Sequence, residues 1–127
     1  MGAKVKGAGT DIIEIARIEE SINKLGEKFL ERVFTKNEIE YCESKNIQKY
    51  QHYAARFAAK EAAFKAISWK IKDKYEVCWK DFEVVNDKQG RPKLNIIGIS
   101  LKGVENIDVS LSNCKEYAIA NVTILER

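Results

Sequence analysis

The sequence predicts an α+β fold in which helices pack on an antiparallel β-sheet. Two observations carry this prediction: apolar residues recur at helical spacing in the first half of the chain, and they alternate with polar residues in the second half. The chain has 127 residues, which is enough to bury a core but short for two domains. One domain over residues 1–127 is therefore expected.

The first expected element is a short strand from Lys4 to Ile13. Gly7 and Gly9 within it permit another backbone to approach closely. The segment carries Asp11 to the point where a helix is expected to begin. Asp11 therefore has two interpretations: it caps a helix that begins near Ile12, or it is a functional carboxylate at the end of a strand.

Helical patterns fill the segment between this strand and the middle of the chain. Apolar residues at spacings of three, four and three run from Ile15 to Leu25, and Gly26 marks an end. Thr35 and Glu38 form a capping box that begins another helix. The longest helix is rich in alanine, so other elements can pack close to it. The expected helices are, in chain order, about 15–25, 27–34, 36–45 and 51–68.

The second half reads as strands. Residues 79–85 are strand-like, and the turn 86–92 leads into another short strand. Apolar and polar residues alternate over 107–112, and 117–125 is a last apolar strand. These two final segments predict a closing antiparallel hairpin.

Composition excludes several classes of protein. No stretch approaches the roughly 20 apolar residues that span a bilayer, and the first residues contain no apolar signal core, so a cytoplasmic location without membrane attachment is expected. A net charge of +3 gives little support to nucleic-acid binding, although a local basic face for an acidic partner stays open. The chain has an odd number of cysteines, Cys42, Cys78 and Cys114, and they are expected to be reduced thiols that fill space. Neither a disulfide framework nor a zinc site is indicated.

Glu61 is the most informative side chain of the long helix. Phe57 and Phe64 lie four residues before it and three after it, so its carboxylate shares a ridge with two aromatic rings. A carboxylate there needs a cation, which is either Lys65 one turn later or a metal ion. Spacing alone favours the Lys65 pair. Taken together with Asp11, however, Glu61 could hold Mg²⁺, which takes a few carboxylate oxygens and fills its other positions with water or phosphate.

The long helix carries three cations close to Glu61 in sequence: Arg56 and Lys60 before it, and Lys65 after it. Such a cluster suits a phosphorylated ligand, although a solvated basic face is the commoner outcome. Other chemistries lack their motifs. His52 has no serine or cysteine motif around it, and the chain contains neither a P-loop nor a G-x-G-x-x-G sequence after a strand.

Three ordered motifs resemble those of the small bacterial holo-[acyl-carrier-protein] synthases, in the 4'-phosphopantetheinyl transferase superfamily. The motifs are Gly9-Thr10-Asp11-Ile12-Ile13-Glu14-Ile15, Arg32-Val-Phe-Thr-Lys-Asn-Glu38 and Arg56-Phe-Ala-Ala-Lys-Glu-Ala-Ala-Phe-Lys-Ala66. Weaker matches continue through Trp79-Lys-Asp-Phe-Glu83, Gly90-Arg-Pro92, Ser110-Leu-Ser112 and Tyr117-Ala-Ile-Ala120. The resemblance runs nearly from end to end and implies the 4'-phosphopantetheinyl transferase-like fold.

The resemblance implies a reaction and a site. The enzyme would move the 4'-phosphopantetheine arm of coenzyme A onto a serine of apo acyl carrier protein, release 3',5'-ADP and support fatty acid biosynthesis. Asp11 and Glu61 would bind Mg²⁺, and Glu61 and Lys65 would serve catalysis. The expected contacts to coenzyme A are Arg56, Lys60, Lys65, Ser112 and Asn113.

The resemblance also implies partners. Family members dock an acidic carrier protein on their first helices and are typically homotrimers with sites between subunits. Arg17, Lys24, Lys28, Phe29 and Arg32 are the candidates for the docking face.

The chain departs from the family pattern in two places. Asn113 stands where family members usually carry a histidine after Ser-x-Ser, and Ser68-Trp69-Lys70 replaces a Gly-Thr-Gly. These departures leave a second hypothesis open, a noncatalytic module that has lost coenzyme A affinity. A third hypothesis, a general nucleotide hydrolase, has no motif of its own.

Overall fold

The computed structural model describes residues 4–98, 104 and 106–126. The strands are β1 (Lys4–Glu14), β2 (Phe82–Asn86), β3 (Pro92–Ile96), β4 (Asn106–Asn113) and β5 (Tyr117–Glu126). The α-helices are α1 (Ile15–Leu25), α2 (Glu27–Val33), α3 (Lys36–Glu43) and α4 (Lys49–Ile67). Short 3₁₀ turns are η1 (Asn46–Gln48), η2 (Ser68–Lys70), η3 (Lys74–Glu76) and η4 (Trp79–Asp81). The α+β class expected from the sequence is confirmed.

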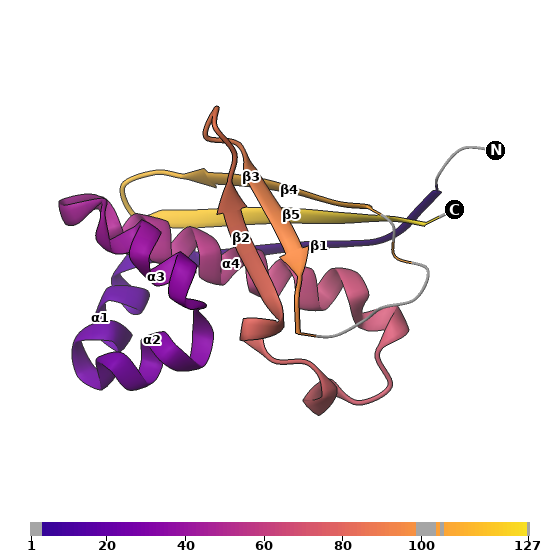
Figure 1. Cartoon of the computed structure of the whole chain (residues 1–127), viewed down its shortest axis with the longest axis horizontal. Coiled ribbons are helices and arrows are strands. Elements are labelled where there is room, and N and C mark those ends of the chain that lie inside the picture. The colour runs from indigo at the N-terminus through magenta and orange to yellow at the C-terminus, as the bar shows by residue number, and fades with distance from the viewer. Residues whose placement is uncertain (1–3, 99–103, 105, 127) are drawn as a thin grey trace.

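The strands form two antiparallel sheets rather than the single sheet expected. β1, β5 and β4 make one sheet with β5 in the centre, and β2 pairs only with β3. Figure 1 shows the β2–β3 hairpin crossing the long strands steeply, while α4 runs along the three-stranded sheet. The predicted hairpin of the last two strands is confirmed. The pairing of β1 with β5 joins the two ends of the chain and leaves no local signal in the sequence.

β1 is longer than expected, and this decides the local role of Asp11. The strand continues to Glu14, which is itself the residue before α1, so Asp11 lies three residues inside the strand opposite Ala120 of β5. The interpretation of Asp11 as a helix cap is therefore wrong. Its side chain shares a face of β1 with Gly9 and Ile13, because alternate residues of a strand point the same way.

β1 lies very close to α4 because both carry small residues at the contact. A Cβ atom on Gly9 would stand 2.0 Å from the carbonyl oxygen of Ala62, and one on Gly7 would stand 1.9 Å from that of Ala66. Contacts this short are impossible for any residue except glycine. The two glycines therefore let the helix backbone lie directly on the strand, which places the side chain of Asp11 beside the next turns of α4.

The helical layer packs through a second core. Ile15, Ile18 and Ile22 of α1 are buried with Phe34 and Tyr53, whereas Leu25 is exposed. The predicted capping box of α3 is present, since the Thr35 hydroxyl accepts from the Glu38 amide and the Glu38 carboxylate accepts from the Thr35 amide. Among the described residues, no helix is both long and apolar enough to cross a membrane.

Only one of the three cysteines fills space. Cys42 is fully buried in the helical core, while Cys78 and Cys114 are exposed, and all three are free thiols. The expectation of packing cysteines is therefore wrong for Cys78 and Cys114, because both lie in turns at the surface.

Candidate active site

One pocket of about 460 Å³ brings the two predicted metal ligands together. β1 supplies Asp11 and α4 supplies Glu61, and the walls are completed by Phe57, Arg17 and Tyr117. Its floor depends on the close approach of β1 and α4. The carboxylates therefore meet through packing of elements that are about 50 residues apart in the sequence, as the resemblance implies and as spacing alone could not show.

Lys65 lies beside Asp11 and not beside Glu61. Its Nζ atom is 3.2 Å from Oδ1 of Asp11 and donates to the backbone oxygen of Thr10 at 2.9 Å. The Lys65 side chain is 55% exposed, whereas that of Asp11 is only 19% exposed. Lys65 thus presents its charge to solvent beside Asp11, although it does not line the pocket itself. The simple Glu61–Lys65 pair favoured by spacing is wrong.

Glu61 is held by an aromatic residue that the sequence did not single out. Nε1 of Trp79 donates to Oε1 of Glu61 at 2.8 Å. Phe57 stacks on the Trp79 ring, and Phe64 meets it edge to face. The two phenylalanines that flank Glu61 in the helix therefore enclose its hydrogen-bond donor.

The donor set fits a magnesium ion held in part by a substrate. Glu14 lines the pocket together with Asp11 and Glu61, but nowhere in the described ranges do three or more His, Cys, Asp or Glu side chains form a cluster that could hold a metal. A closed structural site is therefore not formed by these residues. Mg²⁺ prefers hard oxygen ligands and keeps positions for water and phosphate, so two carboxylates at an open pocket suit it.

The assignment of Lys60 to coenzyme A phosphates does not fit its position. Lys60 is fully buried, and its Nζ atom lies 2.7 Å from Oε1 of Glu38, which is equally buried. Nζ also donates to the backbone oxygens of Trp79 and Phe82 at 3.0 and 2.6 Å. Burial lowers the pKa of Lys60, and the Glu38 carboxylate opposes that shift. Lys60 is part of the core between α4, α3 and β2.

Arg56 is also turned away from the pocket. It is 2% exposed, its Nη2 donates to Oδ1 of Asn86 at 2.6 Å, and its guanidinium lies 4.1 Å from the centre of the Tyr41 ring. Its Nε is buried without a hydrogen-bond partner in the described part of the chain. Of the three cations expected around Glu61, none lines the pocket, and only Lys65 contacts one of its carboxylates, that of Asp11.

Comparison with known proteins identifies the relatives of this site. The model of the 4'-phosphopantetheinyl transferase superfamily matches residues 7–122. The chain belongs to the 4'-phosphopantetheinyl transferase superfamily. A holo-[acyl-carrier-protein] synthase of Geobacter sp. (strain M21) is 47% identical over 128 residues, which cover 97% of this chain and 99% of that protein. The synthase of Ruminiclostridium cellulolyticum is 46% identical over 91% of this chain and 89% of the relative.

The structural match agrees with the sequence match. A Bacillus anthracis holo-(acyl-carrier-protein) synthase in complex with CoA (3',5'-ADP) superposes with a TM-score of 0.80 at 35% identity, covering 99% of this chain and 100% of the other. The transferase fold and the enzyme class predicted from the sequence, a holo-[acyl-carrier-protein] synthase, are thereby confirmed. The noncatalytic module and the general hydrolase lose their support.

In this transferase fold, Ser112 and Asn113 lie apart from the carboxylates. Both are exposed at the end of β4, which is separated from β1 by β5. Nδ2 of Asn113 lies 3.4 Å from Oε1 of Gln51, near the start of α4. The two residues do not line the pocket of Asp11 and Glu61, so within one chain the expected coenzyme A contacts fall into separate places.

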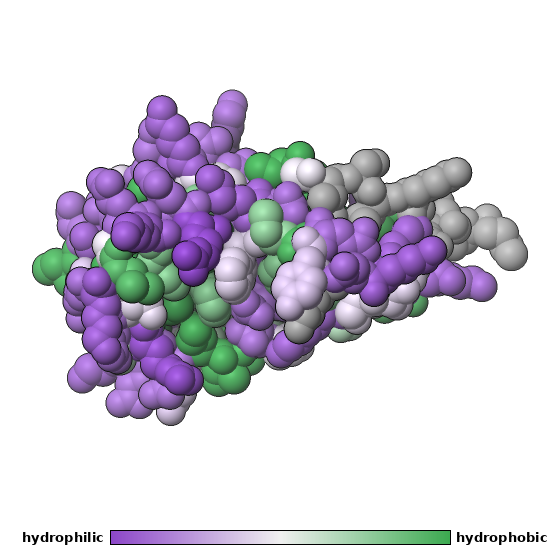
Figure 2. All heavy atoms as spheres, turned by 90° about the horizontal axis from the view of Figure 1, so that it is seen from below, coloured by the Kyte–Doolittle hydropathy of each residue, from purple (hydrophilic) through white to green (hydrophobic). Residues whose placement is uncertain are grey.

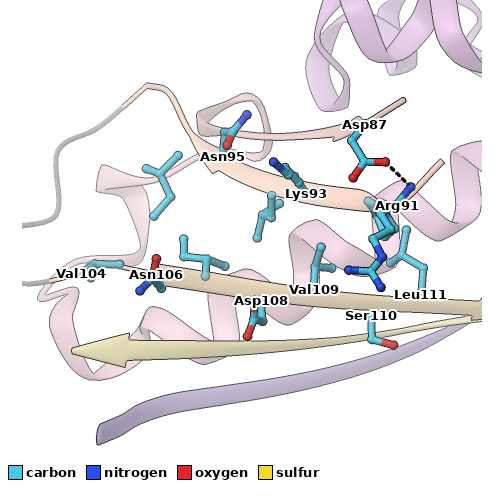
Figure 3. A pocket seen from close by; sticks show the side chains of 14 residues that line it. Asp87, Arg91, Lys93, Asn95, Val104, Asn106, Asp108, Val109, Ser110 and Leu111 are labelled. Atoms are coloured by element: carbon cyan, nitrogen blue, oxygen red, sulfur yellow. Dashed lines mark hydrogen bonds between the residues drawn. The ribbon is translucent and has the colours of Figure 1, made fainter. Parts of the chain in front are cut away.

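A larger groove of about 1180 Å³ lies between β3 and β4. Figure 3 shows Arg91 and Lys93 on the side of β3 and Asp108 and Ser110 on β4, with apolar side chains between the strands. Asp87 accepts from the Arg91 amide at 2.9 Å and holds the turn before β3. None of the expected catalytic or metal-binding residues lines this groove.

The predicted docking residues lie on the surface of α1 and α2. Arg17, Lys24, Lys28 and Arg32 are exposed, and Phe29 is half-buried. Lys24 already pairs with Glu20 at 3.2 Å. Figure 2 shows apolar side chains gathered among polar ones on the helical half of this face. Arg17 also lines the catalytic pocket, so the helical surface and the pocket share an edge.

Proposed function

We propose that the protein transfers the 4'-phosphopantetheine arm of coenzyme A to a serine of an apo acyl carrier protein and releases 3',5'-ADP. The observation that carries this proposal is the pocket in which Asp11, Glu61 and Arg17 meet. The similarity to a synthase described in complex with CoA (3',5'-ADP) supports coenzyme A as the donor. Fatty acid biosynthesis is the pathway that such a carrier serves.

Asp11 and Glu61 are the proposed ligands of a magnesium ion. Bound there, Mg²⁺ would neutralise charge on the pyrophosphate of coenzyme A and on the departing 3',5'-ADP. Lys65 is the proposed donor to a phosphate oxygen, and this is supported by its Nζ atom 3.2 Å from Asp11 and by a side chain open to solvent.

The proposed chemistry exchanges one phosphorus–oxygen bond for another. The serine oxygen of the carrier forms a bond to the β-phosphorus, and the bond from that phosphorus to the oxygen shared with 3',5'-ADP breaks. The serine proton passes to a water molecule hydrogen-bonded to the Glu61 carboxylate and from there to solvent. Oε2 of Glu61 makes no hydrogen bond to the part of the chain described by the structure, so it is the oxygen proposed for the metal ion. Glu61 therefore has one oxygen fixed by Trp79 and one available.

Partners follow from the surface. An acidic carrier protein would dock on Arg17, Lys24, Lys28, Phe29 and Arg32, with its serine directed toward the pocket that Arg17 borders. Ser112 and Asn113, which are exposed, remain proposed coenzyme A contacts, whereas Arg56 is 2% exposed and donates to Asn86 instead. Because Ser112 and Asn113 do not line the same pocket, we propose that a homotrimer places such residues of one subunit beside Asp11 and Glu61 of the next.

The test measures 3',5'-ADP release in the presence of coenzyme A and Mg²⁺ under three conditions. These are with apo carrier protein, with a carrier whose serine is replaced by alanine, and without a carrier. Release only with the intact carrier supports transfer. Release under all three conditions would instead identify a hydrolase, and no release would contradict catalysis. In the same assay Arg32→Glu, at an exposed docking residue that does not line the pocket, should raise KM for the carrier about tenfold or more and leave KM for coenzyme A unchanged.

A further inference from the structure

The hydrogen bond from Trp79 to Glu61 selects one carboxylate oxygen. Nε1 lies 2.8 Å from Oε1 of Glu61. An indole N–H is a donor only, carries no charge and accepts no proton at neutral pH. It can therefore hold Oε1 without competing for a cation, and it leaves Oε2 turned to other partners.

The indole ring is itself packed against two aromatic rings. Phe57 stacks on it with ring centres 6.2 Å apart and planes 29° apart. Phe64 meets it at 90° with centres 6.4 Å apart. Both rings come from α4, the helix that carries Glu61, so the donor and the acceptor move as one unit.

The backbone of Trp79 is fixed from the interior. Lys60 Nζ donates to the Trp79 oxygen at 3.0 Å and is paired with Glu38 at 2.7 Å. Oε2 of Glu38 accepts from the amide of Val84 at 2.8 Å. A buried ion pair thus ties η4 to α4 directly behind the pocket.

We propose that Trp79 is a positioning residue that orients the Glu61 carboxylate toward the metal ion. The proposal rests on the proposed function, because the ion is the magnesium proposed there. Without the indole N–H, Glu61 is free to turn along the helix toward Lys65, one turn away, which would neutralise it. Partners that orient metal ligands typically contribute about 10- to 100-fold to metal affinity.

The test measures the dissociation constant of Mn²⁺ by electron paramagnetic resonance of the free ion. The variants are wild type, Trp79→Phe, Trp69→Phe and Asp11→Ala. Phenylalanine keeps an aromatic ring between Phe57 and Phe64 but has no N–H. Trp69 is the matched control, since it is the other tryptophan and is 44% exposed.

Trp79→Phe should weaken Mn²⁺ binding at least tenfold, and Trp69→Phe should change it less than twofold. In the transferase assay, the Mg²⁺ concentration for half-maximal rate should rise equally in Trp79→Phe, with kcat recovered at saturating Mg²⁺. Equal Mn²⁺ affinity in Trp79→Phe and wild type would overturn the inference alone. Equal affinity in Asp11→Ala and wild type would overturn the proposed metal site and the inference with it.

A second measurement, by nuclear magnetic resonance, keeps Trp79 unchanged, so it does not depend on the folding of a Trp79 variant. The indole N–H resonance of Trp79 is the one that remains in Trp69→Phe. It should move upfield when Glu61→Ala is added, because a hydrogen bond to a carboxylate is lost. An unmoved resonance would overturn the inference.

Discussion

Lys65 pairs with Asp11 in the structure, and its exposed side chain is also the proposed donor to a phosphate of the substrate. Its Nζ contacts Asp11 at 3.2 Å and the Thr10 oxygen at 2.9 Å. Because the side chain is 55% exposed, these contacts contribute little to folding. Replacement of Lys65 is therefore expected to affect the reaction more than the fold.

Lys65→Met should lower the transferase rate about 100-fold, because a donor to the transferred phosphate is lost. The free energy of unfolding in urea should change by less than about 1 kcal/mol. Lys24→Met is the matched control, since Lys24 forms an exposed pair with Glu20 on α1. A Lys65→Met enzyme with the rate of wild type would remove Lys65 from the reaction.

Cys42 makes stability depend on alkaline pH. Burial raises the pKa of its thiol from 9.0 to about 12. The raised pKa means that the folded state keeps the proton, so this contribution to stability is complete below pH 9.0 and is lost as pH rises toward about 12.

Between pH 9 and 11, the free energy of unfolding of wild type should therefore fall more steeply than that of Cys42→Ala, by up to about 1.4 kcal/mol per pH unit. Urea denaturation at several pH values measures the difference. Parallel pH profiles for the two proteins would show that the thiol of Cys42 is not protected by folding.

At the scale of elements, helices were predictable because their signals are local. The capping box of α3 and the apolar stripe of α1 follow from neighbouring residues. The capping box is confirmed, and the stripe is confirmed for Ile15, Ile18 and Ile22 but not for Leu25, which is exposed. The approach of β1 to α4 was expected only as a possibility from Gly7 and Gly9. The pairing of β1 with β5 and the place of Trp79 depend on contacts between distant segments, which periodicity does not report.

Gly9→Ala tests the contact that builds the pocket. The added methyl would stand 2.0 Å from the Ala62 oxygen, so β1 must move away from α4. The variant should be destabilised by about 2–3 kcal/mol or more, and Asp11 should lose its alignment with Glu61.

Ala8→Gly is the control, because Ala8 is exposed on the opposite face of β1 and the change should cost only about 0.5–1 kcal/mol. Thermal unfolding of both variants measures the difference. Equal destabilisation would mean that β1 does not need a glycine at the contact with α4.

The predicted role of Lys60 as a contact to coenzyme A does not fit its position in the structure. It shares the Arg56-to-Lys65 segment with Lys65, the lysine proposed for catalysis, yet the helix turns it into the core against Glu38. The signal was present in the neighbours, because Ala58, Ala59, Ala62 and Ala63 leave space for an element to cover this face. The pairing of Lys60 with Glu38 was not predicted, because the capping box already explained why Glu38 is a glutamate.

Lys60→Met should lower the free energy of unfolding by about 3–5 kcal/mol, because Glu38 is left buried without a cation. Whatever protein stays folded should keep the KM for coenzyme A. Lys24→Met, an exposed pair on α1, should cost less than about 0.5 kcal/mol by the same urea measurement. A raised KM for coenzyme A with unchanged stability would return Lys60 to the ligand site.

At the scale of the whole molecule, one face of the three-stranded sheet is left open. α4 covers the other face, while Ile12 and Ile119, which are cross-strand partners, are 61% and 38% exposed. Apolar side chains gathered on an open sheet face are typical of an interface. This face is the one we expect to join the subunits of the proposed homotrimer.

Light scattering after size exclusion should give a native mass about three times the chain mass of 14.5 kDa. Ile119→Asp should yield a smaller species, because a charge would be buried in the interface. Ile47→Asp is the control, since Ile47 is 95% exposed on η1. A wild-type mass of one chain would contradict the proposed assembly.

The most direct test of the central claim is the mass of apo acyl carrier protein after incubation with this protein, coenzyme A and Mg²⁺. Wild type should add one phosphopantetheine group, about 340 Da from its chemical formula, to the carrier serine. Asp11→Ala, Glu61→Ala and removal of Mg²⁺ with a chelator should each abolish the gain. An unchanged carrier mass with wild type, or a full gain with both carboxylate variants, would contradict transfer at the pocket of Asp11 and Glu61.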